Sequence, residues 1–303
     1  MNATLQTLLN RKSIREYAPR PIEPEVKRDI LAATLRAPTA GNLMLYSIID
    51  ITDQAIKDAL AESCDQQPFI ATAPMLWLFV ADYQRWWDYF RVSDVDKVCQ
   101  QRGLAPRQPQ AGDLLLACCD ALIAAQTAVI AAESLGVGSC YIGDILEKYE
   151  FHRELFDLPD FASPIALICF GYPTPERQAR VQTSRFDQRF VVFENCYQRL
   201  STDDFAEMYR AQEAQLHSRP TRPADIENFG QAVYFRKFAA DYSTEMSRSV
   251  RAMLQTWTGS ASHPIDDLPS TPDEIAAPPE AEAMLTQIRQ GLQTKTEPGR
   301  KAE

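Results

Sequence analysis

A group of basic residues and a hydroxyl near the N-terminus is the first feature that could carry chemistry. Arg11, Lys12, Ser13 and Arg15 fall in the five-residue stretch 11–15. An arginine can bind phosphate through two parallel hydrogen bonds, and a serine adds a neutral donor. In an extended chain alternate side chains point the same way, so Arg11, Ser13 and Arg15 would face one anion. The alternative interpretation is a solvated basic stretch close to a chain end.

Small residues form a second motif, the stretch 38–42 with the sequence Pro-Thr-Ala-Gly-Asn. Side chains of this size allow backbone amides to approach a flat ligand closely. The Asn42 amide offers both a donor and an acceptor, which suits the edge of a heterocyclic ring. The alternative interpretation is an ordinary loop between a helix and a strand.

A third motif is rich in glycine. Three of the chain's 11 glycines fall in the stretch 136–143, Gly-Val-Gly-Ser-Cys-Tyr-Ile-Gly. Such a segment can present backbone N–H groups to a ligand that side chains would obstruct. It is not the dinucleotide-binding fingerprint, because its spacing differs and it follows a helix rather than a strand. The alternative interpretation is a helix C-cap followed by a tight turn.

A second pair of cations follows the predicted strand 164–170. Arg177 and Arg180 come shortly after Gly171-Tyr172-Pro173. They could supply further contacts to a phosphate group at the end of the strand. The alternative interpretation is a surface loop with two solvated arginines.

The composition argues against several other functions. His152, His217 and His263 lie far apart in the sequence, and the seven cysteines form no CxxC pair. These patterns disfavour a zinc site and a disulfide framework, and they predict reduced cysteines in a cytoplasmic protein. The net charge of −10 disfavours nucleic acid binding, and no uncharged apolar run is long enough to span a membrane. An enzyme of this composition would depend on an organic cofactor.

Hydrophobic periodicity predicts the elements that must position these motifs. Strands are predicted over 46–51, 75–81, 139–142 and 164–170, and helices over 25–36, 54–63, 112–135, 147–156, 203–217 and 229–257. The stretch 86–110 has no clear period and is predicted to be irregular and mobile, and 186–193 is predicted to be extended. Few strands among many helices favour an α+β sandwich of three layers over a large doubly wound sheet.

Two segments have an unusual composition. The predicted helix 112–135 is rich in alanine and apolar nearly all round, so we expect it to be buried in a core or a subunit interface. The segment 259–303 holds six prolines and eight acidic residues but no aromatic residue. It has too little apolar surface to offset its ordering entropy, so we expect a largely flexible tail.

The order and spacing of the four motifs, taken together, are more specific than any one of them. Over roughly residues 5–200 the chain resembles the FMN-dependent nitroreductase family, and in particular its oxygen-insensitive NADPH nitroreductase and flavin reductase subgroup. The stretches 76–82 and 194–197 carry the likeness to that subgroup. The resemblance implies an α/β/α sandwich with a central mixed sheet and a long central helix at a homodimer interface. It also implies an FMN-binding domain over 1–200, followed by a helical excursion over 201–258 that packs on the same domain.

The resemblance assigns a role to each motif. The phosphate of FMN would be bound by Arg11, Ser13, Arg15 and Arg180. The flavin ring and ribityl chain would contact Lys12 at the N1–C2=O edge, Thr39, Ala40, Asn42, Met44, Gln67, Tyr141, Ile142 and Gly143. The 2′-phosphate of NADPH would be bound by Arg219 and Arg222 in the excursion. No metal and no catalytic side chain are expected, because the chemistry would occur at the flavin N5.

Two positions depart from the family pattern. Met44 stands where relatives commonly have glutamine, which removes a polar flavin contact and adds apolar surface. Gln178 stands where the subgroup has a lysine, so one positive charge near the phosphate is missing and Arg177 is the candidate to replace it. We expect the first departure to alter the preference for the electron acceptor more than the binding of FMN.

The resemblance thus predicts a homodimeric enzyme that passes two electrons from NAD(P)H, NADPH being favoured, to a small electrophile. The mechanism would be ping-pong, with a nitroaromatic, a quinone or a flavin as acceptor. No nucleic acid and no membrane is expected as a partner. Two alternatives remain open: a flavin-destructive or reductive dehalogenating member of the same fold, and a flavin-binding protein without enzymatic activity.

Overall fold

Two strands that are buried along their whole length form the middle of the sheet. These are β2 (Met75–Asp82) and β4 (Ala162–Gly171), and each is flanked by a shorter strand, β1 (Tyr46–Asp50) or β3 (Gly138–Ile142). The strand order is β1-β2-β4-β3. The computed structural model describes residues 1–218 and 223–259 of the chain, so the predicted tail lies, apart from Gly259, outside the described residues. All four predicted strands are confirmed.

All three strand pairs are antiparallel. The mixed sheet that the resemblance implied is therefore not what the described residues form. The only parallel pairing among them is a single bridge between Ser13 and Ser139. The N-terminal segment is bridged to β3 at this one pair and then continues to an antiparallel bridge between Tyr17 and Pro173. Because it crosses the strand ends instead of running along them, it adds no fifth strand.

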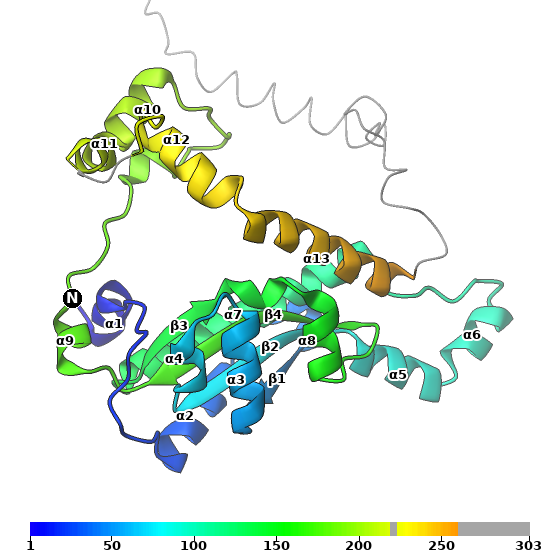
Figure 1. Ribbon diagram of the computed structural model, residues 1–303. Helices are drawn as coiled ribbons and strands as arrows, with labels where there is room; N and C mark the ends of the chain where they lie inside the picture. Colours follow the sequence, from blue (N-terminus) through cyan, green and yellow to red (C-terminus); the bar gives the residue numbers. More distant parts are fainter. Residues whose placement is uncertain (219–222, 260–303) are drawn as a thin grey trace, which may run out of the picture. The chain divides into compact units, whose positions relative to one another are not determined.

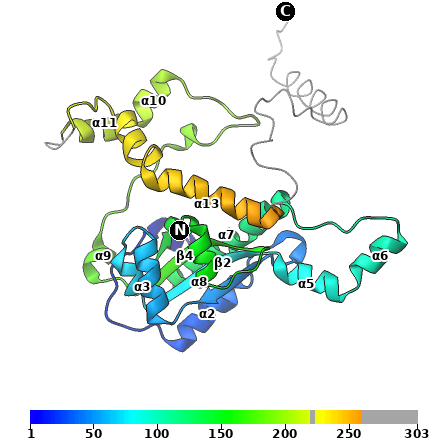
Figure 2. The same ribbon diagram turned by 45° about the vertical axis from the view of Figure 1, so that its right-hand side comes forward.

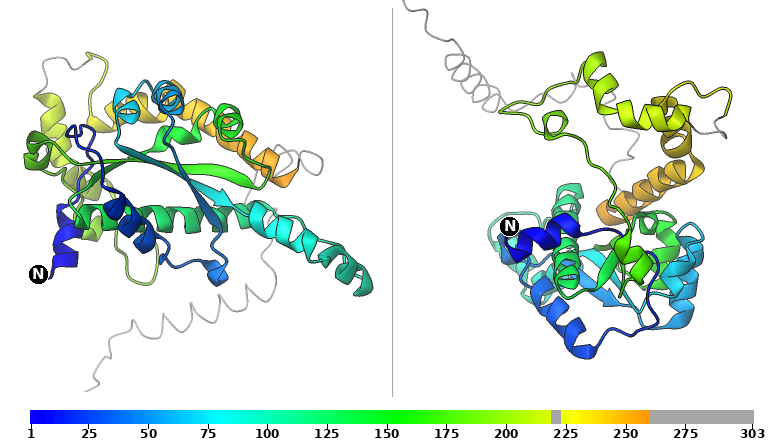
Figure 3. Two further views of the ribbon diagram at one scale, coloured as in Figure 1. Left: turned by 90° about the horizontal axis from the view of Figure 1, so that it is seen from below. Right: turned by 90° about the vertical axis from the view of Figure 1, so that its left-hand side faces the viewer.

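Helices cover both faces of the sheet, which confirms the three-layer α+β sandwich (Figures 1 and 3). On one face, α2 (Pro24–Thr34) and α7 (Ala111–Ser134) pack on a cluster that includes Trp77 and Phe79. On the other, α3 (Gln54–Ser63), α4 (Pro68–Ala71) and the 3-10 turn η2 (Gly143–Leu146) pack on alternate residues such as Leu76 and Leu78. Since both faces are buried, β2 and β4 appear in the sequence as continuous apolar runs.

The segment 86–110 differs from its prediction, because most of it is helical. It contains α5 (Gln84–Val92) and α6 (Val95–Gln101), which project to one side of the sheet in Figure 2. The Trp86 Nε1–H donates to the Leu43 carbonyl oxygen at 2.8 Å. The helices were missed because aromatic residues stand at adjacent positions of α5 and obscure the helical period.

Helix α7 is the structural centre of the fold. Its length and composition would suit a membrane span, but one side of it is buried against the sheet along Ala117, Ala121, Ala124 and Ala128. Other apolar residues of α7, among them Leu115 and Leu122, are exposed. The first helix, α1 (Ala3–Asn10), contacts the C-terminal part of α7.

A buried carboxylate on α7 holds the loop that precedes β1. Asp120 is 2% exposed and accepts hydrogen bonds from the backbone N–H of Ala40 at 2.9 Å and of Leu45 at 3.1 Å. Within the loop, the Met44 N–H donates to Thr39 Oγ1 at 3.2 Å. A buried ion is favourable only when such donors compensate for its lost hydration. The loop 39–45 is therefore fixed to the core at both ends.

From β4 the chain continues through α9 (Pro175–Ala179) and the 3-10 turn η3 (Gln188–Phe190). The excursion predicted over 201–258 then comprises α10 (Thr202–Met208), α11 (Arg210–His217), α12 (Phe229–Val233), the π-helical turn η4 (Tyr234–Phe238) and α13 (Asp241–Thr258). The η3 turn lies inside 186–193, which was predicted to be extended. The remaining helix, α8 (Tyr149–Leu155), lies next to α13.

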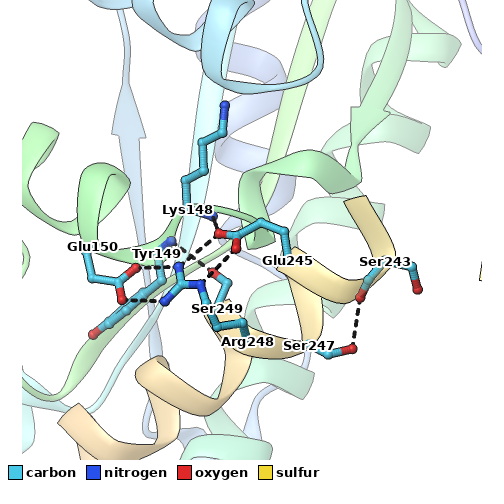
Figure 4. A network of polar contacts seen from close by, with 8 residues as sticks. All are labelled: Lys148, Tyr149, Glu150, Ser243, Glu245, Ser247, Arg248 and Ser249. Atoms are coloured by element: carbon cyan, nitrogen blue, oxygen red, sulfur yellow. Dashed lines mark hydrogen bonds and ion pairs between the residues drawn. The ribbon is translucent and has the colours of Figure 1, made fainter. Parts of the chain in front are cut away.

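Side chains of α13 cap the N-terminus of α8 (Figure 4). Glu245 accepts from the Lys148 N–H at 3.1 Å, and Ser249 Oγ accepts from the Tyr149 N–H at 2.9 Å. Arg248 joins the two helices by a bidentate pair with Glu150, at 2.7 and 2.9 Å. The first N–H groups of a helix have no partner inside the helix, so these contacts satisfy donors that would otherwise be orphaned. The helix α13 is thereby anchored on α8, which packs against the sheet.

Replacing Asp120 with alanine removes the acceptor of two N–H groups in and beside the core. We expect the free energy of unfolding to fall by about 3 kcal/mol, because unpaired buried donors each cost about 1–3 kcal/mol. Asp120→Asn keeps one acceptor of similar shape and should lose less. Urea unfolding followed by circular dichroism measures both changes. An Asp120→Ala midpoint equal to that of the unmodified chain would show that the carboxylate does not hold the loop.

Candidate functional site

A cleft of about 400 Å³ lies between the N-terminal segment and the loop after α9. It brings together residues that the sequence placed in separate motifs. The polar groups that line it and could bind an anion are Arg11, Lys12, Ser13, Arg15, Arg180 and Arg185. All the predicted phosphate ligands therefore lie in one cleft, and Arg185 joins them.

The buried Ile14 seats the basic segment on the sheet. Its side chain is 4% exposed, and its N–H donates to the Ser139 carbonyl oxygen at 2.9 Å. Successive side chains of an extended segment point to opposite sides, so with Ile14 directed inward its neighbours Ser13 and Arg15 are directed outward. The sequence prediction of one common face for Arg11, Ser13 and Arg15 rests on the same alternation, and all three line the cleft.

Two glycines make this crossing possible. A Cβ on Gly138 would lie 2.5 Å from Ile14 Cγ1, and one on Gly171 would lie 2.5 Å from Tyr17 Cδ1. No side chain fits at either position without moving the segment. Gly136 has a different role, because it ends α7. Its φ is +76°, and the next N–H, that of Val137, donates back to the Ala132 carbonyl oxygen at 2.9 Å. The helix-cap interpretation is thus correct for Gly136, whereas Gly138 permits a close approach.

Hydrogen bonds join the two walls of the cleft. Lys12 Nζ donates to the carbonyl oxygens of Gln178 at 2.6 Å and Arg180 at 2.8 Å. In return, Gln182 Nε2 donates to the carbonyl oxygens of Leu9 at 2.6 Å and Arg11 at 3.1 Å. An ammonium group has three donors, so one N–H of Lys12 remains for a ligand. The contact of Lys12 with a flavin edge stays a prediction.

The cations of the cleft are not neutralised by carboxylates. Among residues 1–218 and 223–259, no ion pair involves Arg11, Lys12, Arg15, Arg180 or Arg185. Glu133 is the nearby acid, and burial raises its pKa although Arg11 and Lys12 act to lower it. In a chain with a net charge of −10, this cleft is a local concentration of positive charge. It has the chemistry of an anion site.

The loop 39–45 contains the second group of predicted flavin contacts, which are Thr39, Ala40, Asn42 and Met44. Asn42 and Met44 have positive φ angles of 58° and 50°, as does Gly41 with 56°. A bulky residue in this region carries a backbone cost of about 1–2 kcal/mol, which the bonds to Asp120 offset. Asn42 is exposed, while Thr39, Ala40 and Met44 are half-buried. Their contact with a flavin stays a prediction.

The third predicted set gathers around Asp144. Gln67 Nε2 donates to Asp144 Oδ2 at 2.7 Å and to Cys64 O at 2.9 Å. Asp144 is the residue after Gly143, whose Cα faces open space. Ile142 is 2% exposed and belongs to the core cluster on the α3 face, so its side chain is not available to a ligand. Only its backbone could fulfil the role predicted for it.

Tyr141 also belongs to this predicted set, and Glu147 is an acidic residue whose charge interacts with that of Asp144. Tyr141 is half-buried, and its hydroxyl donates to Gln126 Oε1 on α7 at 3.3 Å. Glu147 is 5% exposed, and burial together with the charges of Asp144 and Asp65 raises its pKa to about 7. At neutral pH this edge of the site thus carries less negative charge than its acidic residues suggest.

The structure also shows what sequence reasoning missed. Arg219 and Arg222 lie outside the described residues, so the predicted NADPH contact is not tested. Arg177 pairs with Glu16 at 2.7 Å and does not line the cleft. No local sequence pattern around Arg185 predicts that it lines the cleft. Asp120 had one signal, since it is a lone acid within an apolar helical run.

Comparisons with known proteins agree with this geometry. Residues 8–172 match the nitroreductase family. The oxygen-insensitive NADPH nitroreductase of Salmonella typhimurium is 33% identical over 202 residues, which cover 66% of this chain and 77% of that protein. The NADPH-flavin oxidoreductase of Vibrio harveyi is 30% identical over 219 residues, covering 72% of this chain and 85% of that protein.

Solved structures show the same fold over a longer stretch. The structure of Bacillus megaterium NfrA2 superimposes with a TM-score of 0.70 at 28% identity, covering 85% of this chain and 98% of that one. The NADPH:FMN oxidoreductase of Vibrio harveyi complexed with NAD+ gives a TM-score of 0.68 at 26% identity, covering 84% and 98%. The family match spans more than half of the chain, and the likeness implied by the four motifs is confirmed. The chain belongs to the nitroreductase family.

Proposed function

We propose that the chain is an FMN-dependent oxidoreductase that transfers two electrons from NAD(P)H to a small electrophilic acceptor. The observation that carries this proposal is the cleft in which five cations and Ser13 converge without a carboxylate partner among the described residues. The relatives named above are an NADPH nitroreductase and NADPH-flavin oxidoreductases. When bound, FMN supplies the hydride and electron chemistry that the side chains of this chain do not provide.

The residues of the cleft fit a phosphate monoester. Such a group carries about two negative charges at neutral pH and offers three strong acceptor oxygens. Arg11, Arg15 and Arg180 supply charged donors, and Ser13 supplies a neutral one. Because no carboxylate competes for them in the described part of the chain, a phosphate would gain their charge-assisted hydrogen bonds.

The rest of the site would position a planar ring beside this cleft. The loop 39–45 is fixed by Asp120 before any ligand arrives, so the ring would meet a preformed surface. Gln67 is oriented by its bond to Asp144, and Gly143 leaves backbone accessible. These residues hold and orient a ring, and none of them needs to transfer a proton.

The ping-pong order is the mechanism we propose. Donor and acceptor would occupy the same position at the ring in turn. NADPH is the favoured donor, because the relatives from Salmonella typhimurium and Vibrio harveyi are named as NADPH-dependent enzymes. The acceptor would be a nitroaromatic, a quinone or a free flavin. We place the enzyme in the cytoplasm, in keeping with its seven free cysteines.

A homodimer is the second part of the proposal. On α7, the side chains of Leu115, Leu116, Leu122 and Ile123 are between 41% and 68% exposed. Leu8 and Leu9 on the neighbouring α1 are also exposed. Monomeric proteins rarely expose so many large apolar side chains on one helix, so this surface suits a second copy of the chain.

The FMN prediction is tested by a double substitution. Arg11→Ala with Arg15→Ala should raise the Kd for FMN by about 100-fold or more, because each charged hydrogen bond contributes about 1.5–3 kcal/mol. Quenching of flavin fluorescence measures this Kd, and Arg28→Ala on the exposed side of α2 serves as the control. A purified chain that takes up no FMN would end the proposal. FMN lost under oxygen, or halide released from a halogenated substrate, would instead indicate the destructive or dehalogenating alternative.

Met44→Gln tests the acceptor preference. Restoring a polar amide at this half-buried position should lower kcat/KM for menadione relative to a nitrofuran by about fivefold, because apolar contact with the acceptor is lost. FMN binding should change less than this ratio. Steady-state oxidation of NADPH with each acceptor gives the ratio, and an unaltered ratio would show that Met44 does not contact the acceptor. An absence of NADPH oxidation with both would favour a non-enzymatic flavin protein.

The dimer is tested on α7. Sedimentation should give twice the chain mass of 34.2 kDa for the unmodified protein and a smaller mass for Leu122→Glu, because a carboxylate would be buried in the interface. Leu35→Glu, at an exposed position after α2, is the matched control. A monomeric unmodified chain, or a dimer that tolerates Leu122→Glu, would contradict the assignment of this surface.

A further inference from the structure

The cleft contains a cation that the sequence motifs did not assign. We propose that Arg185 binds the phosphate of FMN and supplies the positive charge that is missing at Gln178. This inference rests on the proposed function and extends it by one residue. It also decides against Arg177, which the sequence offered as the replacement.

Arg177 is already engaged elsewhere. Its guanidinium forms an ion pair with Glu16 at 2.7 Å, and Arg177 does not line the cleft. Moving it to a phosphate would separate this pair and leave Glu16 without its partner. The Arg177 side chain therefore has a competing anion, whereas Arg185 has none among residues 1–218 and 223–259.

Arg185 lines the cleft together with Arg180 and the basic segment. Its Nη1 donates to the Thr183 carbonyl and hydroxyl oxygens and to the Ser184 carbonyl oxygen, at 2.9 to 3.2 Å. These acceptors are neutral, so they orient the guanidinium without cancelling its charge. Within the described part of the chain, Nε and Nη2 have no acceptor, and they remain available to an anion.

The loop that carries Arg185 is fixed across the cleft. Lys12 binds the carbonyl oxygens of Gln178 and Arg180, and Gln182 binds those of Leu9 and Arg11. These four hydrogen bonds end three residues before Arg185. The loop up to Gln182 is thus set before the ligand binds, which lowers the entropic cost of bringing Arg185 to it.

The test compares FMN with riboflavin, which has the same ring and ribityl chain without the phosphate. The full-length chain is freed of flavin, and each Kd is measured by fluorescence quenching. Arg185→Ala should raise the Kd for FMN about tenfold, the effect of one exposed charge-assisted hydrogen bond, and leave the Kd for riboflavin unchanged. Arg177→Ala is the matched control and should change neither value. Arg185→Lys should fall between, because it keeps the charge and loses the fork.

Three results would overturn the inference. These are unchanged FMN binding by Arg185→Ala, an equal loss for FMN and riboflavin, or the phosphate-specific loss appearing in Arg177→Ala instead. Thermal melting of each variant separates a binding effect from unfolding, and Arg185 is exposed, so the variants should melt as the unmodified chain does. Failure of the unmodified chain to bind FMN would overturn the proposed function, and this inference with it.

Discussion

The packing of Ile14 on the first residues of β3 is the contact on which the site depends. Cations brought into one cleft repel each other, and at 4 Å the repulsion is about 1 kcal/mol even in bulk water. Burial of Ile14 against Gly138 and its hydrogen bond to Ser139 hold Arg11 and Arg15 where they lie. The four hydrogen bonds of Lys12 and Gln182 then add the opposite wall. The core thus stabilises a charge arrangement that is unfavourable until an anion binds.

The loop 39–45, which is proposed to contact the flavin ring, depends on α7. This helix supplies the buried surface that the sheet requires and, through Asp120, the acceptor that fixes the loop 39–45. Its remaining apolar side chains are exposed, which is the reason for expecting a second copy of the chain there. One helix therefore links the core, the loop 39–45 that is proposed to meet the flavin ring, and the proposed dimer interface. A substitution on either side of α7 should therefore change ligand binding at the site.

Sequence reasoning was most successful where a local pattern records the environment. β2 and β4 were found because burial on both faces leaves continuous apolar runs, and the basic segment was found because its residues are consecutive. The pairing direction of the strands has no local signal, so the expected mixed sheet was wrong. Arg185 was missed because its place in the cleft depends on the path of the loop from Gln178 to Gln182. Helix α5 was missed because its aromatic residues stand at adjacent positions and obscure the helical period, and α6 was missed because its seven residues are too few to show one.

The central claim is that the cleft between the segment 11–15 and the loop 180–185 binds the phosphate of FMN. The most direct measurement is the crystal structure of the chain grown with FMN. We expect the phosphate oxygens to lie within hydrogen-bond distance of Arg11, Ser13, Arg15 and Arg180, with the ring against the loop 39–45. FMN bound at another place, or a phosphate directed into solvent with the cleft residues unengaged, would contradict the account.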